Sequence, residues 1–304
     1  MTMYSESSSM AHSEFFAGSG NWIQQQIGTG DKANGVVVDS LYQYLHFTSL
    51  LDAFAARLIK SHAIDGLRFE FVELPLNFEC DFGLQRKGKH QLDFRMKHQG
   101  MSLGLLRISR HRKFLSAEVN SINLAVEALG GPLSNAILFA TAYHSAYHDS
   151  LTGLYNRAAL DLSLLKKPDY GDSLQIALLV LDVDQFKLIN DNCGHAVGDE
   201  VLKQFSHSLI SSVRDCDTIY RYGGDEFVVA LANMNTGKGC EIAEKICRAI
   251  EERTLRVKNH RIKLTTTIGV TELRQGESLK DAFLRADKAL LLGKKSGKNK
   301  VVSQ

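Results

Sequence analysis

The chain is poor in proline and cysteine. Its 304 residues include 3 prolines and 5 cysteines. The cysteines are odd in number and show no CxxC spacing: Cys80, Cys193, Cys216, Cys240 and Cys247. This usage gives no sign of a disulfide framework and favours reduced thiols in a cytoplasmic protein. The histidines show no convincing ligand spacing either, so we expect neither haem nor zinc.

Long apolar runs and an excess of one charge are also absent. No stretch offers the eighteen or so uninterrupted apolar residues that cross a bilayer, and the N-terminus lacks the charged start and apolar core of a signal peptide. We therefore expect a cytoplasmic protein with no membrane span. The 36 Lys and Arg nearly balance the 34 Asp and Glu, giving a formal net charge of +2. This balance gives no case for nucleic-acid binding, so the basic residues matter through their placement.

The length suggests two domains. Residues 1–35 are rich in Ser and Gly, and we expect a flexible N-terminal segment there. Residues 36–132 predict a sensor domain, residues 133–148 a connector helix, and residues 149–304 a second domain.

The sensor prediction depends on periodicity. Apolar residues recur at helical spacing over 37–61, and a second helical pattern runs from about 114 to 138. Strand-like segments lie between them, at 67–72, 91–96 and 101–108. Gly130-Gly131-Pro132 interrupts the second helical pattern, which predicts a helix stop or kink where sensor motion would be passed on.

The segment Arg221-Tyr222-Gly223-Gly224-Asp225-Glu226-Phe227 places two carboxylates at a turn. Apolar residues on both sides predict two short strands, and Gly223-Gly224 predicts a two-residue hairpin turn. Paired glycines allow positive φ and leave room for a bulky ligand such as a triphosphate. Considered alone, this segment would favour an ordinary surface hairpin with solvated acids.

A second pair of acids ends an apolar run. Residues 177–184 predict a buried strand that closes with Asp182 and Asp184. Residues i and i+2 share one face of a strand, so both carboxylates would point toward one edge. Because Mg²⁺ is commonly held by one or two carboxylates and substrate phosphates, Asp182 and Asp225 predict a metal site. For Asp184, solvent exposure or helix capping stays open.

Together with the segment 186–202, these motifs resemble the GGDEF family of diguanylate cyclases. The resemblance implies an α/β fold for 149–304, a cyclase-like, ferredoxin-related palm with helices on a largely antiparallel sheet. It implies that Asp182, the carbonyl of Val183, Asp225 and Glu226 bind Mg²⁺ or Mn²⁺, and that Glu226 also assists the attacking hydroxyl. The first domain looks like a divergent GAF-like α/β sensor.

The same resemblance assigns substrate contacts. Asn190 and Asp199 occupy the guanine-reading positions, which suits a carboxylate that accepts from guanine N1 and N2 and an amide that accepts and donates. Otherwise these two residues are a helix-end Asn and the N-cap of a helix beginning near Glu200. Phe186 and Lys187 would lie near the phosphates, with Gly223 and Gly224 in the turn beneath them.

Residues 149–157 resemble the turn and helix that open these domains, and residues 286–299 resemble the terminal helix and loop. Lys294 and Lys298 are the cationic candidates for the triphosphate there. The sequence departs from the family pattern at Leu291, Gly293 and Lys298, where Tyr, Ala and Arg are common. A lysine binds phosphate but loses the bidentate fork of arginine. A solvated C-terminal tail is the alternative for these lysines.

Arg214 and Asp217 stand three residues apart, just before the predicted hairpin. They match the family's RxxD product-inhibition site, where the guanidinium would fork onto guanine or phosphate. The alternative is a local surface ion pair, which contributes little to stability in water.

The resemblance implies an enzyme that condenses two GTP molecules into cyclic di-GMP with release of two pyrophosphates. One domain holds one GTP, so the reaction requires a homodimer. An unknown ligand or protein partner of the sensor and the product at the RxxD site would regulate it. The alternatives are a catalytically silent receptor for GTP or cyclic di-GMP, and a related cyclase with an adenine-containing product.

Overall fold

A computed structural model describes residues 47–73, 76–83, 88–165 and 175–304. The predicted flexible segment 1–35 and the first ten residues of the predicted helix 37–61 lie outside these residues. The chain contacts divide the protein into two compact units, with the division between Ser145 and Ala146. We call them the N-terminal unit and the C-terminal unit.

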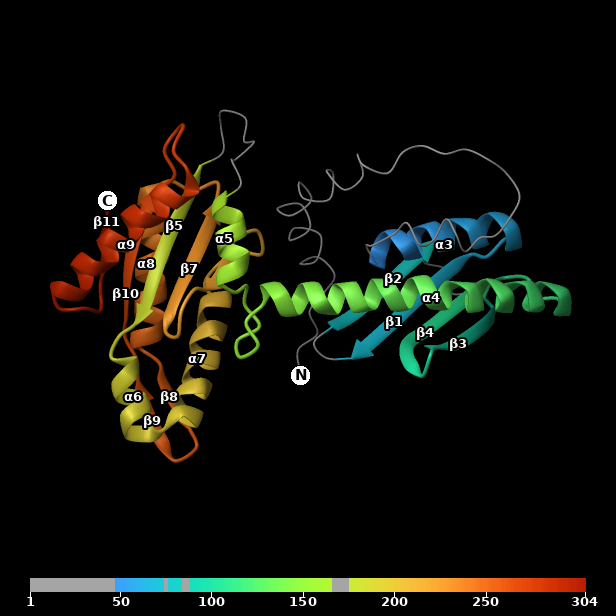
Figure 1. Cartoon of the computed structure of the whole chain (residues 1–304), viewed down its shortest axis with the longest axis horizontal. Helices are drawn as coiled ribbons and strands as arrows, with labels where there is room; N and C mark the ends of the chain where they lie inside the picture. Colours follow the sequence, from blue (N-terminus) through green and yellow to red (C-terminus); the bar gives the residue numbers. More distant parts are fainter. Residues whose placement is uncertain (1–46, 74–75, 84–87, 166–174) are drawn as a thin grey trace. The chain divides into compact units, whose positions relative to one another are not determined.

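The N-terminal unit is a four-stranded antiparallel sheet that packs against two helices (Figure 1). The strand order is β2-β1-β4-β3. The elements are α3 (Phe47–His62), β1 (Gly66–Glu73), β2 (Leu76–Gly83), β3 (His90–His98), β4 (Met101–Arg110) and α4 (Ser116–Tyr147). The three predicted strands, the second helical pattern and the described part of the first, from residue 47 on, are confirmed. Strand β2 was not predicted, and the assignment of this unit as GAF-like stays a prediction.

The core of the N-terminal unit lies on one face of its sheet. Leu67, Phe69 and Phe71 alternate along β1 and are buried against α3 and α4. On the other face, Arg68 Nε lies 2.8 Å from Glu70 Oε1 in a half-exposed ion pair. One apolar and one polar face are typical of an antiparallel sheet.

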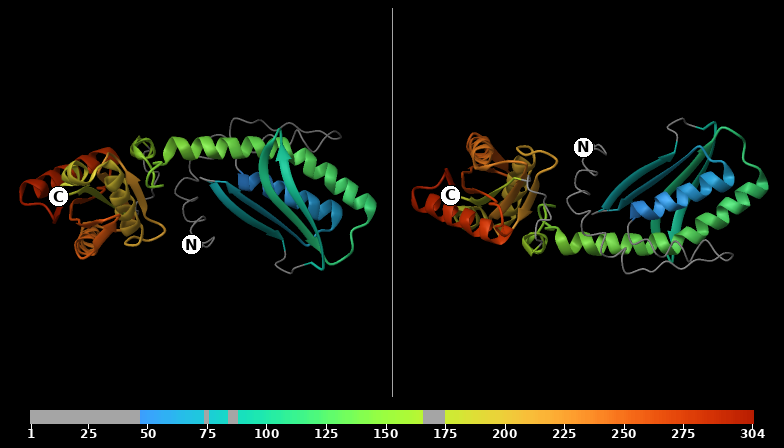
Figure 2. Two further views of the ribbon diagram at one scale, coloured as in Figure 1. Left: turned by 90° about the horizontal axis from the view of Figure 1, so that it is seen from below. Right: turned by 90° about the horizontal axis from the view of Figure 1, so that it is seen from above.

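Of the stop or kink predicted at Gly130-Gly131-Pro132, helix α4 shows the stop to be wrong, and the kink stays a prediction. The helix runs unbroken through this segment, although Figure 2 shows it bending along its length. An internal proline costs about 3 kcal/mol of helix stability. Burial of Leu129, Leu133 and Ile137 in one core outweighs that cost, since each such side chain contributes about 1.5–3 kcal/mol. The predicted boundary between residues 132 and 133 therefore lies inside a helix.

Helix α4 is also long and apolar enough to meet a membrane-span criterion. Its most apolar 18-residue window has a mean hydropathy of 1.3, and half of that window is buried in the protein. A core helix meets the same criterion, and α4 supplies the N-terminal unit with much of its core.

The C-terminal unit is built around a five-stranded sheet in the order β11-β10-β5-β7-β6 (Figure 1). All neighbours are antiparallel except β10 and β11. Its elements are α5 (Arg157–Leu165), β5 (Ile176–Val183), α6 (Phe186–Cys193), α7 (His195–Ile210), β6 (Thr218–Arg221), β7 (Glu226–Ala232), α8 (Thr236–Glu251), β8 (Thr254–Val257), β9 (His260–Lys263), β10 (Thr266–Glu272), α9 (Leu279–Lys295) and β11 (Val301–Ser303). The predicted largely antiparallel α/β architecture is confirmed.

Strand β5 is buried on both faces. Ala177, Leu179 and Leu181 join a core with α7 and α8. Leu178 and Val180 join a second core with α5 and α9. Because the faces alternate, Asp182 lies on the α9 side of the sheet.

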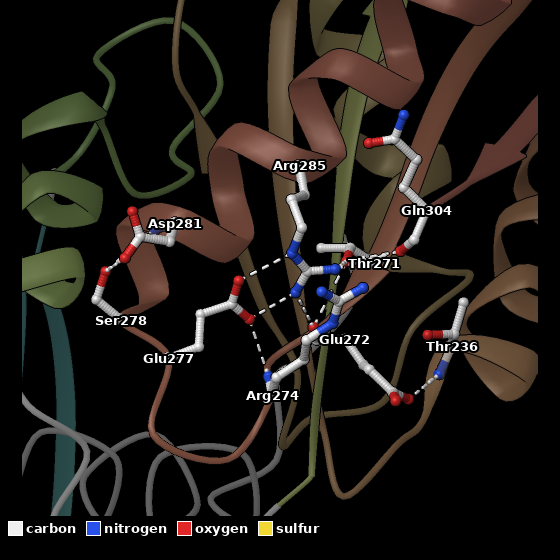
Figure 3. Close-up of polar contacts among 9 residues, drawn as sticks. All are labelled: Thr236, Thr271, Glu272, Arg274, Glu277, Ser278, Asp281, Arg285 and Gln304. Carbon is white, nitrogen blue, oxygen red and sulfur yellow. Dashed lines mark hydrogen bonds and ion pairs between the residues drawn. The ribbon is translucent and has the colours of Figure 1, made fainter.

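Helix α9 is tied to the sheet by Arg285 (Figure 3). The guanidinium contacts both oxygens of Glu277 and donates to the carbonyl of Glu272 at 2.6 Å and to the Thr271 hydroxyl. It also reaches the carbonyl of Gln304 at 3.3 Å. Ser278 caps the helix as predicted, since its Oγ accepts from the backbone N–H of Asp281. Arg285 therefore joins α9 to β10 and to the end of the chain.

Four cysteines with described side chains are free thiols: Cys193, Cys216, Cys240 and Cys247. The reduced state of the five cysteines stays a prediction. Burial raises the pKa of the Cys247 thiol to about 12, which keeps it protonated.

Candidate active site

The sheet brings three predicted carboxylate residues to one end of two paired strands. Asp182, near the end of β5, pairs with Glu226, the first residue of β7. Beside them, the backbone N–H of Val183 donates to the carbonyl of Asp225 at 3.1 Å. Residues more than forty positions apart in the sequence therefore lie together at one end of these two inner strands.

Asp182 is largely buried in this site. Burial is the main cause that raises the pKa of its carboxyl, and the charges of Asp225 and Asp184 raise it further. Lys294 opposes the shift, because its Nζ lies 2.6 Å from Asp182 Oδ2. The fold thus concentrates negative charge here and balances part of it with one ammonium.

The donor set fits a magnesium ion. Nowhere in the described part of the chain do three His, Cys, Asp or Glu side chains gather closely enough to hold a metal by themselves. Mg²⁺ does not need such a cage, because it keeps several waters and commonly uses one or two carboxylates with substrate phosphates. Asp182 and Asp225 are hard oxygen donors at a half-buried edge, and Glu226 is their neighbour.

Asp184 has a different role from Asp182. Its carboxylate accepts from the hydroxyls of Thr265 and Thr267 at 2.8 and 2.7 Å, and from the backbone N–H of Asn299 at 3.0 Å. It is buried rather than solvent-exposed, and it does not cap a helix. Asp184 therefore fastens the loop after α9 to the sheet beside Asp182. No sequence pattern pointed to its threonine partners, which lie more than eighty residues away.

The loop between β6 and β7 corrects the predicted two-residue turn. It comprises the four residues from Tyr222 to Asp225, because the strands end at Arg221 and begin again at Glu226. Neither glycine lies among the described residues with positive φ. A side chain at Gly224 would meet open space, and a Cβ at Gly223 would lie 2.7 Å from Glu226 Oε2. These glycines therefore provide room rather than an unusual backbone conformation.

Arg221 braces this loop and links it to the opening motif. Its Nη2 donates to the carbonyl of Gly224 at 2.8 Å, and its Nη1 donates to Asp149 Oδ1 at 2.9 Å. Hydrogen bonds from Thr152 and Arg221 outweigh the effect of burial and lower the pKa of Asp149. Two motifs 72 residues apart in sequence thus form one structure. The sequence placed both motifs but did not show that they touch.

Asn190 lies inside α6, and its side-chain Oδ1 is buried without a hydrogen-bond partner. A buried polar atom of this kind usually has a partner, so a ligand donor would satisfy it. The opposing position is Gly198, where a Cβ would lie 1.9 Å from that oxygen. Only a glycine admits the Asn190 side chain here, a requirement that sequence reasoning missed.

Three other predicted substrate residues lie on the two helices that carry Asn190 and Gly198. Phe186 is buried and Lys187 exposed in the first turn of α6. Asp199 is exposed within α7, which begins at His195 and not near Glu200. Asp199 is therefore not an N-cap, because Gly194 occupies that position.

The C-terminal departures have different consequences. Gly293 is required, because a Cβ there would lie 2.6 Å from Thr267 Cγ2. Leu291 is half-exposed on α9. Lys298 follows the helix at a φ of 61°, with its backbone N–H donating to the carbonyl of Gly293 at 3.1 Å. Lys294 thus forms an ion pair with Asp182, whereas the side chain of Lys298 forms no ion pair with the described residues.

Arg214 and Asp217 lie at the opposite end of the β6–β7 hairpin. Arg214 Nη2 contacts Asp217 Oδ1 at 2.8 Å and the carbonyl of Ala232 at 2.6 Å. The Asp217 carboxylate is fully buried and also accepts from the backbone N–H groups of Arg214 and Ala232. The pair is thus a structured ion pair, and Arg214 remains half-exposed.

Comparison with known proteins places this geometry in a family. Residues 146–300 match the GGDEF family, described as "Diguanylate cyclase, GGDEF domain". Diguanylate cyclase DgcZ of Escherichia coli is 37% identical over 152 residues, which are 50% of this chain and 51% of DgcZ. Diguanylate cyclase VdcA of Vibrio cholerae is 35% identical over 200 residues, 64% of this chain and 56% of VdcA. The chain thus spans about half the length of these relatives.

Solved structures of GGDEF domains are similar to this chain as well. The coiled coil and GGDEF domain of DgcB from Caulobacter crescentus, crystallised with c-di-GMP, is 27% identical with a TM-score of 0.54. The match covers 63% of this chain and 100% of that one. The GGDEF domain of DgcB alone is 31% identical with a TM-score of 0.50, covering 52% of this chain and 95% of that one. Half of the chain, including every residue of the site from Asp149 to Asn299, therefore belongs to the GGDEF family.

Proposed function

We propose that this protein is a diguanylate cyclase that condenses two GTP molecules into cyclic di-GMP and two pyrophosphates. The observation that carries the proposal is the meeting of Asp182, Asp225 and Glu226 at one end of β5 and β7, in a chain of the GGDEF family. Its relatives DgcZ and VdcA are named diguanylate cyclases, which supports the same activity here.

Asp182, the Val183 carbonyl, Asp225 and Glu226 would hold Mg²⁺ or Mn²⁺ next to the triphosphate. When bound, the ion supplies Lewis-acid polarisation of the α-phosphate and eases loss of the proton from the 3′-hydroxyl. Glu226, the first residue of β7, would receive that proton or hold a second ion. Much of the rate enhancement then comes from charge neutralisation and positioning.

Asn190 and Asp199 would read the guanine base. The unpaired Oδ1 of Asn190 is an acceptor in need of a donor, and guanine N1 and N2 carry N–H groups. The exposed carboxylate of Asp199 would accept from the same edge, while adenine lacks this donor pair. Lys187, Lys294 and Lys298 would contact the phosphates, and Phe186 and the open space at Gly224 would shape their site.

A homodimer is required, because each subunit would hold one GTP and the 3′-hydroxyl of one must reach the α-phosphate of the other. The C-terminal half of α4 offers an exposed apolar stripe for such an interface. Leu138 is 55% exposed and Phe139 is 40% exposed, and neither belongs to the core of the N-terminal unit. We assign the N-terminal unit to regulation by an unknown ligand or partner.

Arg214 and Asp217 would bind the product and inhibit the enzyme. The buried Asp217 carboxylate fixes the backbone of the loop, and the half-exposed Arg214 guanidinium would then meet guanine or phosphate. The crystallised complex of DgcB with c-di-GMP supports product binding in this family.

The test is incubation of the purified protein with GTP and Mg²⁺, with the products identified by mass. Cyclic di-GMP should form, and Asp225→Ala should abolish it. Glu241→Ala removes the same charge from an exposed position on α8 and should leave turnover unchanged. Turnover that survives in Asp225→Ala contradicts the assignment. Binding of GTP or cyclic di-GMP without any product would instead favour a silent receptor.

A further inference from the structure

Lys294 forms an ion pair with a carboxylate that we assign to metal binding. Its Nζ lies 2.6 Å from Asp182 Oδ2, although 112 residues separate the two in sequence. The Lys294 side chain is 30% exposed and that of Asp182 is 13% exposed. The pair is therefore largely shielded from water, which distinguishes it from the weak ion pairs of an open surface.

The fold fixes this contact rather than leaving it to chance. Gly293 lets the last turn of α9 lie against β10, where any side chain would press on Thr267. Thr267 is in turn the direct neighbour of Asp182 across the β10–β5 pairing. Lys294 follows Gly293 in the sequence, so this packing holds the backbone of Lys294 close to the strand pair that carries Asp182.

The charges around Asp182 require a cation. Asp184 and Asp225 both act on Asp182 with like charge. The carboxylate of Asp184 is already satisfied by Thr265, Thr267 and Asn299. Lys294 is thus the group that balances Asp182 in the structure. A divalent ion on the same carboxylate would lie within a few ångströms of the ammonium, and two cations at that range repel each other.

We infer that Lys294 is a placeholder for the metal charge, which neutralises Asp182 while the nucleotide is absent and moves to the triphosphate when metal and nucleotide enter together. The inference rests on the proposed function, because it uses the metal and triphosphate sites assigned above. A lysine suits the exchange, since its ammonium is a point charge on a flexible four-carbon stem. The metal alone must displace Lys294 into water, whereas metal with GTP gives the ammonium a new partner. Metal and nucleotide should therefore bind with positive coupling.

The test measures Mn²⁺ binding to the nucleotide-free, full-length protein, using the electron paramagnetic resonance signal of free Mn²⁺. Lys294→Gln should bind Mn²⁺ roughly tenfold more tightly than the unmodified protein, because one nearby positive charge no longer competes with the ion. Lys295→Gln removes the same charge from the exposed neighbouring position and should change the affinity little. Misfolding of Lys294→Gln would weaken Mn²⁺ binding, so tighter binding cannot be explained by it.

A second titration uses a non-hydrolysable GTP analogue with and without Mn²⁺. In the unmodified protein, each ligand should tighten the binding of the other, and Lys294→Gln should lose part of this coupling while binding the analogue more weakly. Equal Mn²⁺ affinity in Lys294→Gln and the unmodified protein overturns the placeholder role and leaves the metal site standing. No protein-dependent Mn²⁺ binding even in the presence of the analogue, or binding that survives Asp225→Ala, overturns the metal assignment and the proposed function with it.

Discussion

Several glycines of the C-terminal unit are needed for space. Gly198 admits the side chain of Asn190, and Gly293 lets α9 approach Thr267. Neither has the positive φ that usually explains a required glycine. At Gly293, glycine leaves room for the methyl group of Thr267 that faces it.

Gly293→Ala should destabilise the C-terminal unit. The new Cβ would press on Thr267 Cγ2, and overpacking of this kind costs about 1–3 kcal/mol, partly offset by the roughly 1 kcal/mol by which alanine favours a helix. Thr267→Ser removes that methyl group and keeps the hydroxyl that donates to Asp184. In a double-mutant cycle of urea unfolding, the two changes should therefore be coupled favourably by about 1 kcal/mol. Strictly additive effects would show that the contact is absent.

The sequence identified most residues of the candidate site, but it did not show which residues contact one another. Asp182, Asp225 and Glu226 stand in a recognisable motif, and the structure brings them together as predicted. The partner of Asp182 was not predicted, because Lys294 was assigned only to the triphosphate. Its position depends on how α9 lies on the sheet, which no local pattern encodes.

At the scale of elements, α4 is attached to its sheet at its first turn. Glu118 accepts from Arg110 and Arg112 and from the backbone N–H of Leu115. Arg110 is buried and also donates to the carbonyl of His62 at the end of α3. The start of α4, the end of β4 and the end of α3 are therefore joined by one guanidinium.

This junction should make the N-terminal unit sensitive to acid. The hydrogen bond from Arg110, helped by Leu115 N–H, lowers the pKa of Glu118 from 4.5 to about 2. Because the folded pKa is the lower one, the carboxylate stabilises the fold fully above about pH 4.5 and stops doing so as the pH falls toward 2. Glu118→Gln should lower the melting temperature at pH 7 and flatten its dependence on pH over that window.

Melting curves of the full-length protein from pH 7 to pH 2 check this expectation. Glu127→Gln changes an exposed glutamate of the same helix and serves as the matched control. If Glu118→Gln and Glu127→Gln follow the same curve, the Arg110 junction does not stabilise α4.

Helix α9 depends on the fork of Arg285 in a similar way. Lysine would keep the charge but could not contact Glu277, Glu272 and Gln304 at once. Arg285→Lys should therefore lower the free energy of unfolding by about 1–3 kcal/mol, the usual effect of leaving buried partners unpaired. Equilibrium unfolding in guanidinium chloride measures this free energy, with Arg256→Lys on the exposed side of β8 as the control. A loss as small as the control's would mean that α9 is held by its apolar contacts alone.

At the scale of the whole molecule, the proposed reaction needs two copies of the chain. The exposed stripe on α4 would supply contacts between them. Leu138→Glu should raise the dimer dissociation constant by roughly tenfold or more, because each dimer would then bury two unpaired carboxylates. Sedimentation equilibrium checks the dissociation constant, and cyclase activity should fall most at low protein concentration.

Leu284→Glu makes the same substitution at an exposed leucine of α9 and is the control for added charge. Unchanged association and activity in Leu138→Glu would place the dimer interface elsewhere on the chain.

The sequence by itself determined the family, the carboxylates of the site and the elements with local signals, such as β5 and the helix capped by Ser278. These features depend on residues a few positions apart, so periodicity and capping reveal them. Only the tertiary structure decided that α4 continues through Gly130-Gly131-Pro132 and that Lys294 meets Asp182. Both depend on burial and packing between distant segments, which outweigh local preference and leave no trace in a short stretch of sequence.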